Sequence, residues 1–269
     1  MRKIIGILLI TVFTLIGCSN STQSTSEEKE VTLKVGTLIP PMTDILEIVK
    51  PLMKEEGVQL EIVVLGDNVQ PNTALANKEI DVNFFQHVPY MKEFNEKNDA
   101  DLVPVQAIYH AVYGAYSKKY EKIEELPKGA KIAIANDPTN IGRSLNILDD
   151  HGLITLKADV GIFATQADII ENENNYEFVE VDLLMLARMM DDADLVLMTP
   201  AYAAPLGLTP NKDALLTEGI ESEFAITLVA RSDNAESKAV KLLAEKMTGP
   251  EVKKFLEEDY AETALPAFK

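Results

Sequence analysis

From residue 31 onward, the chain alternates between two hydrophobic rhythms. Residues 31–37 alternate apolar and polar side chains with a period of two, which is typical of a half-buried strand. Residues 43–54 then place apolar side chains three and four positions apart, which predicts an amphipathic helix. Strand-like and helix-like segments continue to succeed one another toward the C-terminus.

The remaining elements follow from the same two periodicities. Further strands are predicted at residues 58–65, 102–107, 112–116, 131–135, 177–181, 195–199 and 224–231. Further helices are predicted at residues 72–78, 138–150, 182–190, 236–247 and 250–259. Strands separated by helices indicate an α/β fold with mixed, mainly parallel sheets that are flanked by helices.

This number of strands is more than one small sheet usually holds, so the pattern predicts two lobes. We expect lobe 1 to contain residues 31–112 and 232–269, and lobe 2 to contain residues 113–231. The chain would then cross near residues 112–117 and return near residues 231–233. A cleft between two such lobes is a natural ligand site.

The first 30 residues have a different character. Arg2 and Lys3 precede an apolar run that ends at Gly17, which is typical of a secretory signal peptide over residues 1–17. This run is shorter than the roughly 20 apolar residues that a membrane span needs. Residues 15–18 resemble the bacterial lipobox, in which the cysteine is acylated, and Cys18 is the only cysteine of the chain.

The alternative is an ordinary signal peptide with an incidental cysteine. Residues 18–30 are almost entirely polar and are expected to form a flexible tether between the lipid and the globular body. The protein would then be anchored to the cell membrane, exported to the outer face of the cytoplasmic membrane or to the periplasm. One cysteine also leaves no intramolecular disulfide and no cysteine-rich metal site.

Charge and motifs exclude several classes of function. The net charge is −18, which repels phosphate backbones and argues against nucleic-acid binding. His87, His110 and His151 are scattered, and Ser117 and Ser144 lack a base that the sequence can identify. There is no HExxH, GxSxG, P-loop or GxGxxG motif. We therefore expect neither an enzyme nor a cofactor.

One polar segment could bind an anion. Asn136 or Asp137 can cap a helix that Pro138 begins, and the free N–H groups of such a first turn attract negative charge. Asn140 and Arg143 lie three residues apart and therefore share a face of this helix. The arginine fork can hold a carboxylate through two parallel hydrogen bonds. The alternative is a well-capped helix with a surface arginine.

A second segment concentrates aromatic side chains. Phe84, Phe85, His87 and Tyr90 lie within seven positions of a chain that is only 6% aromatic and has no tryptophan. Pro89 favours a turn or a helix start at this point. The segment is interpreted either as the end of a core strand or as an aromatic wall for a small apolar ligand.

These segments belong to a longer set of motifs that extends from residue 31 to residue 260. The set comprises VQPN at residues 69–72, FQHVPY at 85–90, GAYSKK at 114–119, NDPTNIGRSL at 136–145, GLITLK at 152–157, Arg188 with Asp191 and Asp192, Tyr202-Ala203, and GLTP at 207–210. With these motifs the chain resembles the NlpA/MetQ family of methionine-binding lipoproteins, which serve ABC importers. The resemblance implies a two-lobed periplasmic-binding fold of type II that closes on its ligand and docks on a permease.

The resemblance also implies roles for particular residues. The segment with Phe85, His87 and Tyr90 is expected to enclose the ligand side chain, and Arg143 with Asn140 to hold its carboxylate.

Four further positions depart from the family pattern. Asn68 stands where a tyrosine is expected, Thr199 where an asparagine is expected, and Phe224-Ala225-Ile226 replaces Tyr-x-Asn. Loss of one buried hydrogen bond to a charged group costs about 1.5–3 kcal/mol, enough to change selectivity tenfold. The favoured ligand is therefore expected to be acidic at one end and apolar elsewhere.

The leading hypothesis is capture of a small carboxylate-bearing solute, most simply methionine or a related apolar amino acid, and its delivery to an ABC permease with a separate ATPase. A short peptide or a modified amino acid is an alternative ligand. A surface lipoprotein with an adhesive or structural role is an alternative function, and the dense motifs around a cleft argue against it.

Overall fold

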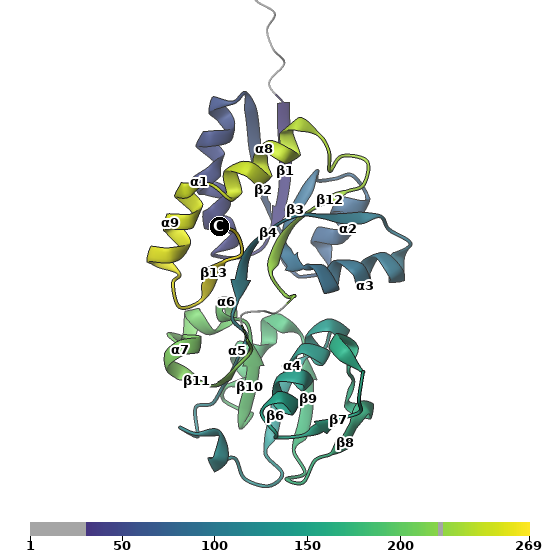
Figure 1. Ribbon diagram of the computed structural model, residues 1–269, viewed down its shortest axis with the longest axis vertical. Helices are drawn as coiled ribbons and strands as arrows, with labels where there is room; N and C mark the ends of the chain where they lie inside the picture. The colour runs from purple at the N-terminus through teal and green to yellow at the C-terminus, as the bar shows by residue number, and fades with distance from the viewer. Residues whose placement is uncertain (1–30, 220–222) are drawn as a thin grey trace, which may run out of the picture.

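The computed structural model describes residues 31–219 and 223–269, and they form two lobes stacked along the long axis of the molecule (Figure 1). Lobe 1 is built on a six-stranded sheet of order β13-β4-β12-β3-β1-β2. Its strands are β1 (Val31–Thr37), β2 (Val58–Val64), β3 (Val82–His87), β4 (Leu102–Ala111), β12 (Ile226–Arg231) and β13 (Ala264–Pro266). Its helices are α1 (Met42–Glu55), α2 (Gln70–Ala76), α3 (Val88–Asn98), α8 (Lys238–Met247) and α9 (Pro250–Asp259).

Lobe 2 is built on a five-stranded sheet of order β11-β5-β10-β6-β9. Its strands are β5 (Gly114–Tyr116), β6 (Lys131–Ala135), β9 (Glu177–Val181), β10 (Leu195–Met198) and β11 (Ala214–Thr217), and a small separate ladder joins β7 (Thr155–Leu156) to β8 (Ile169–Glu171). Its helices are α4 (Pro138–Asp150), α5 (Leu186–Met189), α6 (Pro200–Ala203) and α7 (Pro210–Asp213). Short 3₁₀ turns lie at η1 (Ile123–Glu125), η2 (Gly161–Phe163), η3 (Gln166–Asp168), η4 (Leu183–Met185) and η5 (Ala204–Leu206).

The two-lobed α/β architecture is confirmed, and both sheets are mixed. Strand β1 pairs in parallel with β2 and β3, and β6 pairs in parallel with β9 and β10. The strands next to the crossovers, β4, β5, β11 and β12, pair antiparallel with their neighbours. The predicted predominance of parallel pairing therefore does not extend to these strands, because a chain that leaves a lobe and returns to it runs in both directions at the crossover.

One predicted boundary is wrong. The strand predicted at residues 224–231 exists as β12, but it lies in lobe 1, where it is inserted between β3 and β4. All six of its residues are buried, which is typical of a central strand. The chain therefore returns to lobe 1 between β11 and β12 rather than near residues 231–233. A strand that is buried on both faces lacks the alternation of polar and apolar residues, and its sequence does not indicate which sheet it joins.

Each lobe has its own core. Helix α1 buries Ile45, Leu46, Val49 and Met53 completely against the first sheet, as its helical spacing predicts. Burial of one such side chain contributes about 1.5–3 kcal/mol to the free energy of folding.

The helix predicted at residues 182–190 is replaced by the 3₁₀ turn η4 and the single turn α5.

Helix α4 is the most deeply buried helix at the junction of the lobes. Its second turn is packed so closely against η2 that an ideal Cβ built on Gly142 would lie 2.0 Å from the carbonyl oxygen of Ile162. A glycine at this position lets the helix approach another backbone that any larger residue would displace. This approach fixes the position of Arg143, the next residue of the helix.

In the part of the chain that the structure describes, no helix combines the length and hydrophobicity that crossing a bilayer requires.

Candidate functional site

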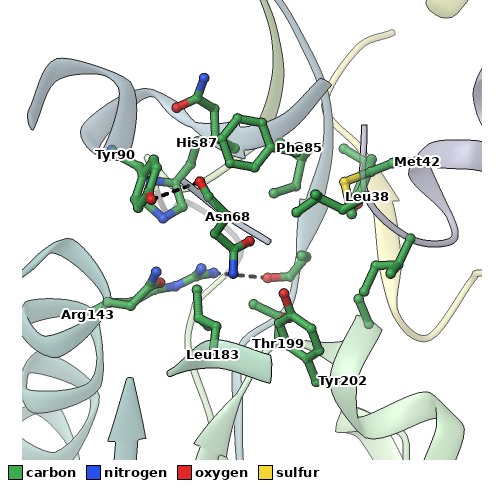
Figure 2. Close-up of a pocket in the computed structure, with 17 residues that line it drawn as sticks. Leu38, Met42, Asn68, Phe85, His87, Tyr90, Arg143, Leu183, Thr199 and Tyr202 are labelled. Carbon is green, nitrogen blue, oxygen red and sulfur yellow. Dashed lines mark hydrogen bonds between the residues drawn. The ribbon is translucent and has the colours of Figure 1, made fainter. Parts of the chain in front are cut away.

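A pocket lies between the two lobes beside the crossover (Figure 2). It encloses about 580 Å³ of space free of protein atoms, including the part open to solvent. Lobe 1 contributes Leu38, Ile39, Met42, Asn68, Phe85, Gln86, His87, Tyr90, Tyr109, Ala111 and Ile226. Lobe 2 contributes Asn140, Arg143, Leu183, Thr199, Ala201 and Tyr202.

Arg143 supplies the positive charge of this pocket. Its side chain is 2% exposed and points from α4 toward the centre of the site (Figure 2). The guanidinium carbon lies 4.5 Å from the ring centroids of both Tyr113 and Phe224, so the cation is held between two aromatic faces. The interpretation of Arg143 as a surface arginine on a capped helix is therefore wrong.

The two-pronged edge of this guanidinium already faces a carboxylate of the protein. Nε of Arg143 donates to Oε2 of Glu218 at 2.8 Å, and Nη2 donates to Oε1 of the same side chain. Nη2 also donates to the backbone carbonyl of Ala111 at 3.0 Å. The edge of the guanidinium formed by Nε and Nη2 is therefore occupied by the protein itself and is not open to a ligand carboxylate in this structure.

The helix start next to it is also satisfied internally. Asp137 is the N-cap, as predicted, and its carboxylate accepts from the backbone N–H of Asn140 at 3.0 Å and from the Thr139 hydroxyl at 2.9 Å. The side-chain amide of Asn140 donates to both oxygens of Asp137. The predicted anion position at this helix start is thus occupied by Asp137, which itself brings negative charge close to the pocket.

His87 connects the two lobes in its neutral form. It is the N-cap of α3, and its Nδ1 accepts from the backbone N–H of Tyr90 at 3.2 Å. The proton of the neutral ring is therefore on Nε2. Burial and the nearby charge of Arg143 lower the pKa of His87 to about 3, although a side-chain hydrogen bond with Asn140 of lobe 2 opposes the shift. The imidazole is therefore a polar part of the pocket wall that stays uncharged near neutral pH.

Aromatic side chains at and just after the end of the buried strand β3 form the apolar wall of the pocket in lobe 1, which fits both interpretations of this segment; contact with a ligand stays a prediction. The ring of Tyr90 packs edge-on against Phe85 at 5.9 Å, and its hydroxyl donates to the backbone carbonyl of Asn68 at 3.0 Å. Figure 2 places Leu38 and Met42 on the same side as Phe85. A ligand side chain against this wall would meet hydrocarbon, ring edges and one thioether.

The wall in lobe 2 is more polar. Burial raises the pKa of Tyr202 to about 12, although the Asn68 side chain of lobe 1 opposes the shift. Thr199 is the N-cap position of α6, with no hydrogen bond from its hydroxyl to that helix. Asn68, which replaces the expected tyrosine, lines the pocket together with Tyr202 of lobe 2.

Eight of the nine predicted ligand-site residues line the pocket, namely Asn68, Phe85, His87, Tyr90, Asn140, Arg143, Thr199 and Ile226. The ninth, Phe224, lies behind it and packs on His87, with ring centroids 4.9 Å apart, and on Arg143. Their role in binding a ligand stays a prediction. The predicted lipidation site, Cys18, lies outside the described residues.

Sequence reasoning missed two important side chains. Tyr202 belongs to a family motif, but its sequence gives no sign that it lines the pocket. It lies in lobe 2, far along the chain from the aromatic segment of lobe 1. Glu218 carried no signal at all, because it lies 75 residues from Arg143 in an otherwise unremarkable segment. No group of three or more histidine, cysteine, aspartate or glutamate side chains could hold a metal ion in residues 31–219 and 223–269.

A cleft between two mixed-sheet lobes, with a buried cation and an apolar wall, defines the class of two-lobed periplasmic binding proteins of type II. Residues 33–268 match the model of the NlpA lipoprotein family. The chain belongs to this family.

Similar proteins agree with this assignment. The chain is 36% identical over 247 residues to the D-methionine-binding lipoprotein MetQ of Yersinia pestis. The matched region covers 91% of this chain and 89% of that protein. The structure of a nutrient-binding protein from Burkholderia cenocepacia bound to methionine has a TM-score of 0.85 and 34% identity, covering 88% of this chain and all of the other. A periplasmic substrate-binding protein of an ABC transporter from Coxiella burnetii has a TM-score of 0.83 and 36% identity, covering 87% of this chain and all of the other.

Proposed function

We propose that this protein captures a small apolar amino acid, most simply methionine, and delivers it to an ABC permease that a separate ATPase drives. The observation that supports this most directly is the pocket itself, in which buried Arg143 faces the same space as the aromatic wall of Phe85 and Tyr90. The related proteins named above include one that is bound to methionine and one that belongs to an ABC transporter. Binding and delivery, without chemical change of the solute, is the activity that this arrangement supports.

Calorimetric titration of ligand-stripped protein with L- and D-methionine tests the ligand. We expect methionine to bind the wild type, and the variant Thr199→Asn/Ile226→Asn to bind it about tenfold more tightly or better, because each restored amide adds a hydrogen bond to the charged end of the ligand. Both positions line the pocket.

The variant Ile226→Leu is the matched control, since it changes the shape of the side chain without adding an amide. Tight binding to the wild type with no gain in the double variant would show that these two positions do not set specificity. If neither methionine nor any other apolar amino acid bound, the proposed ligand class would be wrong.

We further propose that Cys18 carries the lipid that anchors this protein on the outer side of the cytoplasmic membrane. The replacement Cys18→Ser should move most of the protein from the membrane fraction to the soluble fraction, because it removes the only thiol of the chain and leaves the folded body unchanged. Cell fractionation with an immunoblot measures this. A Cys18→Ser protein that is cleaved and still wholly membrane-bound would contradict the anchor.

A further inference from the structure

Glu218 is built into the crossover between the lobes. It follows β11 directly, and its backbone N–H donates to the carbonyl of Tyr113 at 3.0 Å. The backbone N–H of Tyr113 donates in return to Oε1 of the Glu218 side chain at 2.9 Å. With Nε and Nη2 of Arg143, the carboxylate has three donors and is 9% exposed. Its position is therefore fixed by the protein.

The hydrogen-bond inventory of Arg143 shows what remains for a ligand. A guanidinium has five N–H groups. Glu218 and Ala111 take those of Nε and Nη2. Among the residues that the structure describes, Nη1 has no hydrogen-bond partner, although it is buried. Arg143 is a residue of the pocket lining, so Nη1 is the nitrogen of this side chain that is left for a ligand carboxylate.

The charges around this contact are already balanced. Among the described residues that line the pocket, Arg143 is the one charged side chain, because His87 is neutral there. Glu218 cancels that charge at contact distance, and the Asp137 carboxylate lies one side chain further away, behind Asn140. A ligand that brings only a carboxylate would leave this buried region with an uncompensated negative charge, which is costly in a low-dielectric site. A ligand that also carries an ammonium group would not.

We propose that Glu218 is a specificity-determining residue that makes the pocket select solutes with both a carboxylate and an ammonium group over plain carboxylates. This inference rests on the proposed function, in which an amino acid is the ligand. The sequence alone predicts that a solute acidic at one end and apolar elsewhere is favoured. That prediction assumes that the charge of Arg143 is unpaired in the empty protein, and the proposal reverses it because Glu218 pairs with Arg143.

Two matched ligand pairs measure this selectivity. L-methionine is compared with 4-(methylthio)butanoate, and L-leucine with 4-methylpentanoate, so that each pair differs only in the ammonium group. Each ligand is titrated by calorimetry into ligand-stripped wild type, Glu218→Gln, Glu218→Asp and Glu223→Gln. Glu223 is an exposed glutamate of the same returning segment, and its replacement makes the same change of charge without touching Arg143.

The wild type should prefer the amino acid of each pair by about 100-fold or more, since the ammonium group offsets a buried charge. In Glu218→Gln this preference should fall at least about tenfold, mainly through tighter binding of the plain carboxylate to the uncompensated arginine. Glu218→Asp keeps the charge and should keep the preference even if both affinities drop. Glu223→Gln should behave as the wild type.

The result that overturns the inference is an equal loss of affinity for both members of a pair in Glu218→Gln, which would mean that Glu218 only supports the structure. A wild type that binds the plain carboxylate as tightly as the amino acid overturns it without any variant. If the wild type bound neither amino acid, the inference would fail together with the proposed ligand class, whereas an equal loss for both members of a pair overturns the inference alone. If no protein bound any of the four ligands, both would fail.

Discussion

Replacement of Arg143 by alanine should abolish measurable ligand binding and also destabilise the empty protein. The loss of the guanidinium leaves the Glu218 carboxylate nearly buried, and within the described part of the chain its remaining partner is the backbone N–H of Tyr113. Removing one member of a buried ion pair costs about 3–5 kcal/mol of folding free energy, because the remaining charge is unpaired. Tyr113 and Phe224 also lose the cation that their rings contact.

Urea unfolding and calorimetry measure the two effects separately. The double variant Arg143→Ala/Glu218→Ala should recover part of the stability, because no charge stays buried, but should not recover binding. The exposed Arg188 provides a matched control, and Arg188→Ala should change neither quantity. A fully stable Arg143→Ala protein would mean that Glu218 becomes hydrated when its partner is removed.

Replacement of Gly142 by alanine should have an effect of similar size through backbone displacement. The added methyl group would lie 2.0 Å from the Ile162 carbonyl oxygen and 2.6 Å from its carbon, and both are backbone atoms that cannot rotate away. We expect a loss of about 3 kcal/mol or more of unfolding free energy, as for other strongly overpacked sites. Ligand affinity should fall as well, since a shift of α4 carries Arg143 with it.

Gly66→Ala is the matched control for this variant. A Cβ at Gly66 would have no neighbour closer than 3.9 Å, so the same chemical change meets open space. Thermal unfolding of both variants, with the secondary structure followed by circular dichroism, measures the difference. If Gly142→Ala melted at the temperature of the wild type, η2 would have to move away from α4 at little cost.

The parts of the fold that the sequence predicted are those that depend on local periodicity. Helices α1, α4 and α9 follow from apolar spacing, and the N-cap Asp137 follows from cap chemistry over a few residues. The two-lobed organisation follows from the number of strands. What local pattern could not supply is the partner of each strand, so β12 was assigned to the wrong lobe.

The same distinction separates the predicted from the missed parts of the site. Asn140 and Arg143 share a face of one helix, and Phe85, His87 and Tyr90 share one strand end, so short-range rules predicted both groups. Glu218 meets Arg143 only through the crossover, where chain segments 75 residues apart run side by side. The arginine fork was therefore predicted to hold a ligand when it holds the protein's own carboxylate, because a sequence pattern does not show which charges are already paired.

The contacts of Arg143 also have a consequence for the entropy of binding. An arginine side chain that a ligand must order for itself loses rotamer freedom worth about 1.5–2 kcal/mol. Here Glu218, Ala111 and the rings of Tyr113 and Phe224 supply that order from within the protein. A solute that docks on Nη1 therefore meets an arginine whose conformational freedom has already been lost during folding, and more of its contact energy remains available as affinity.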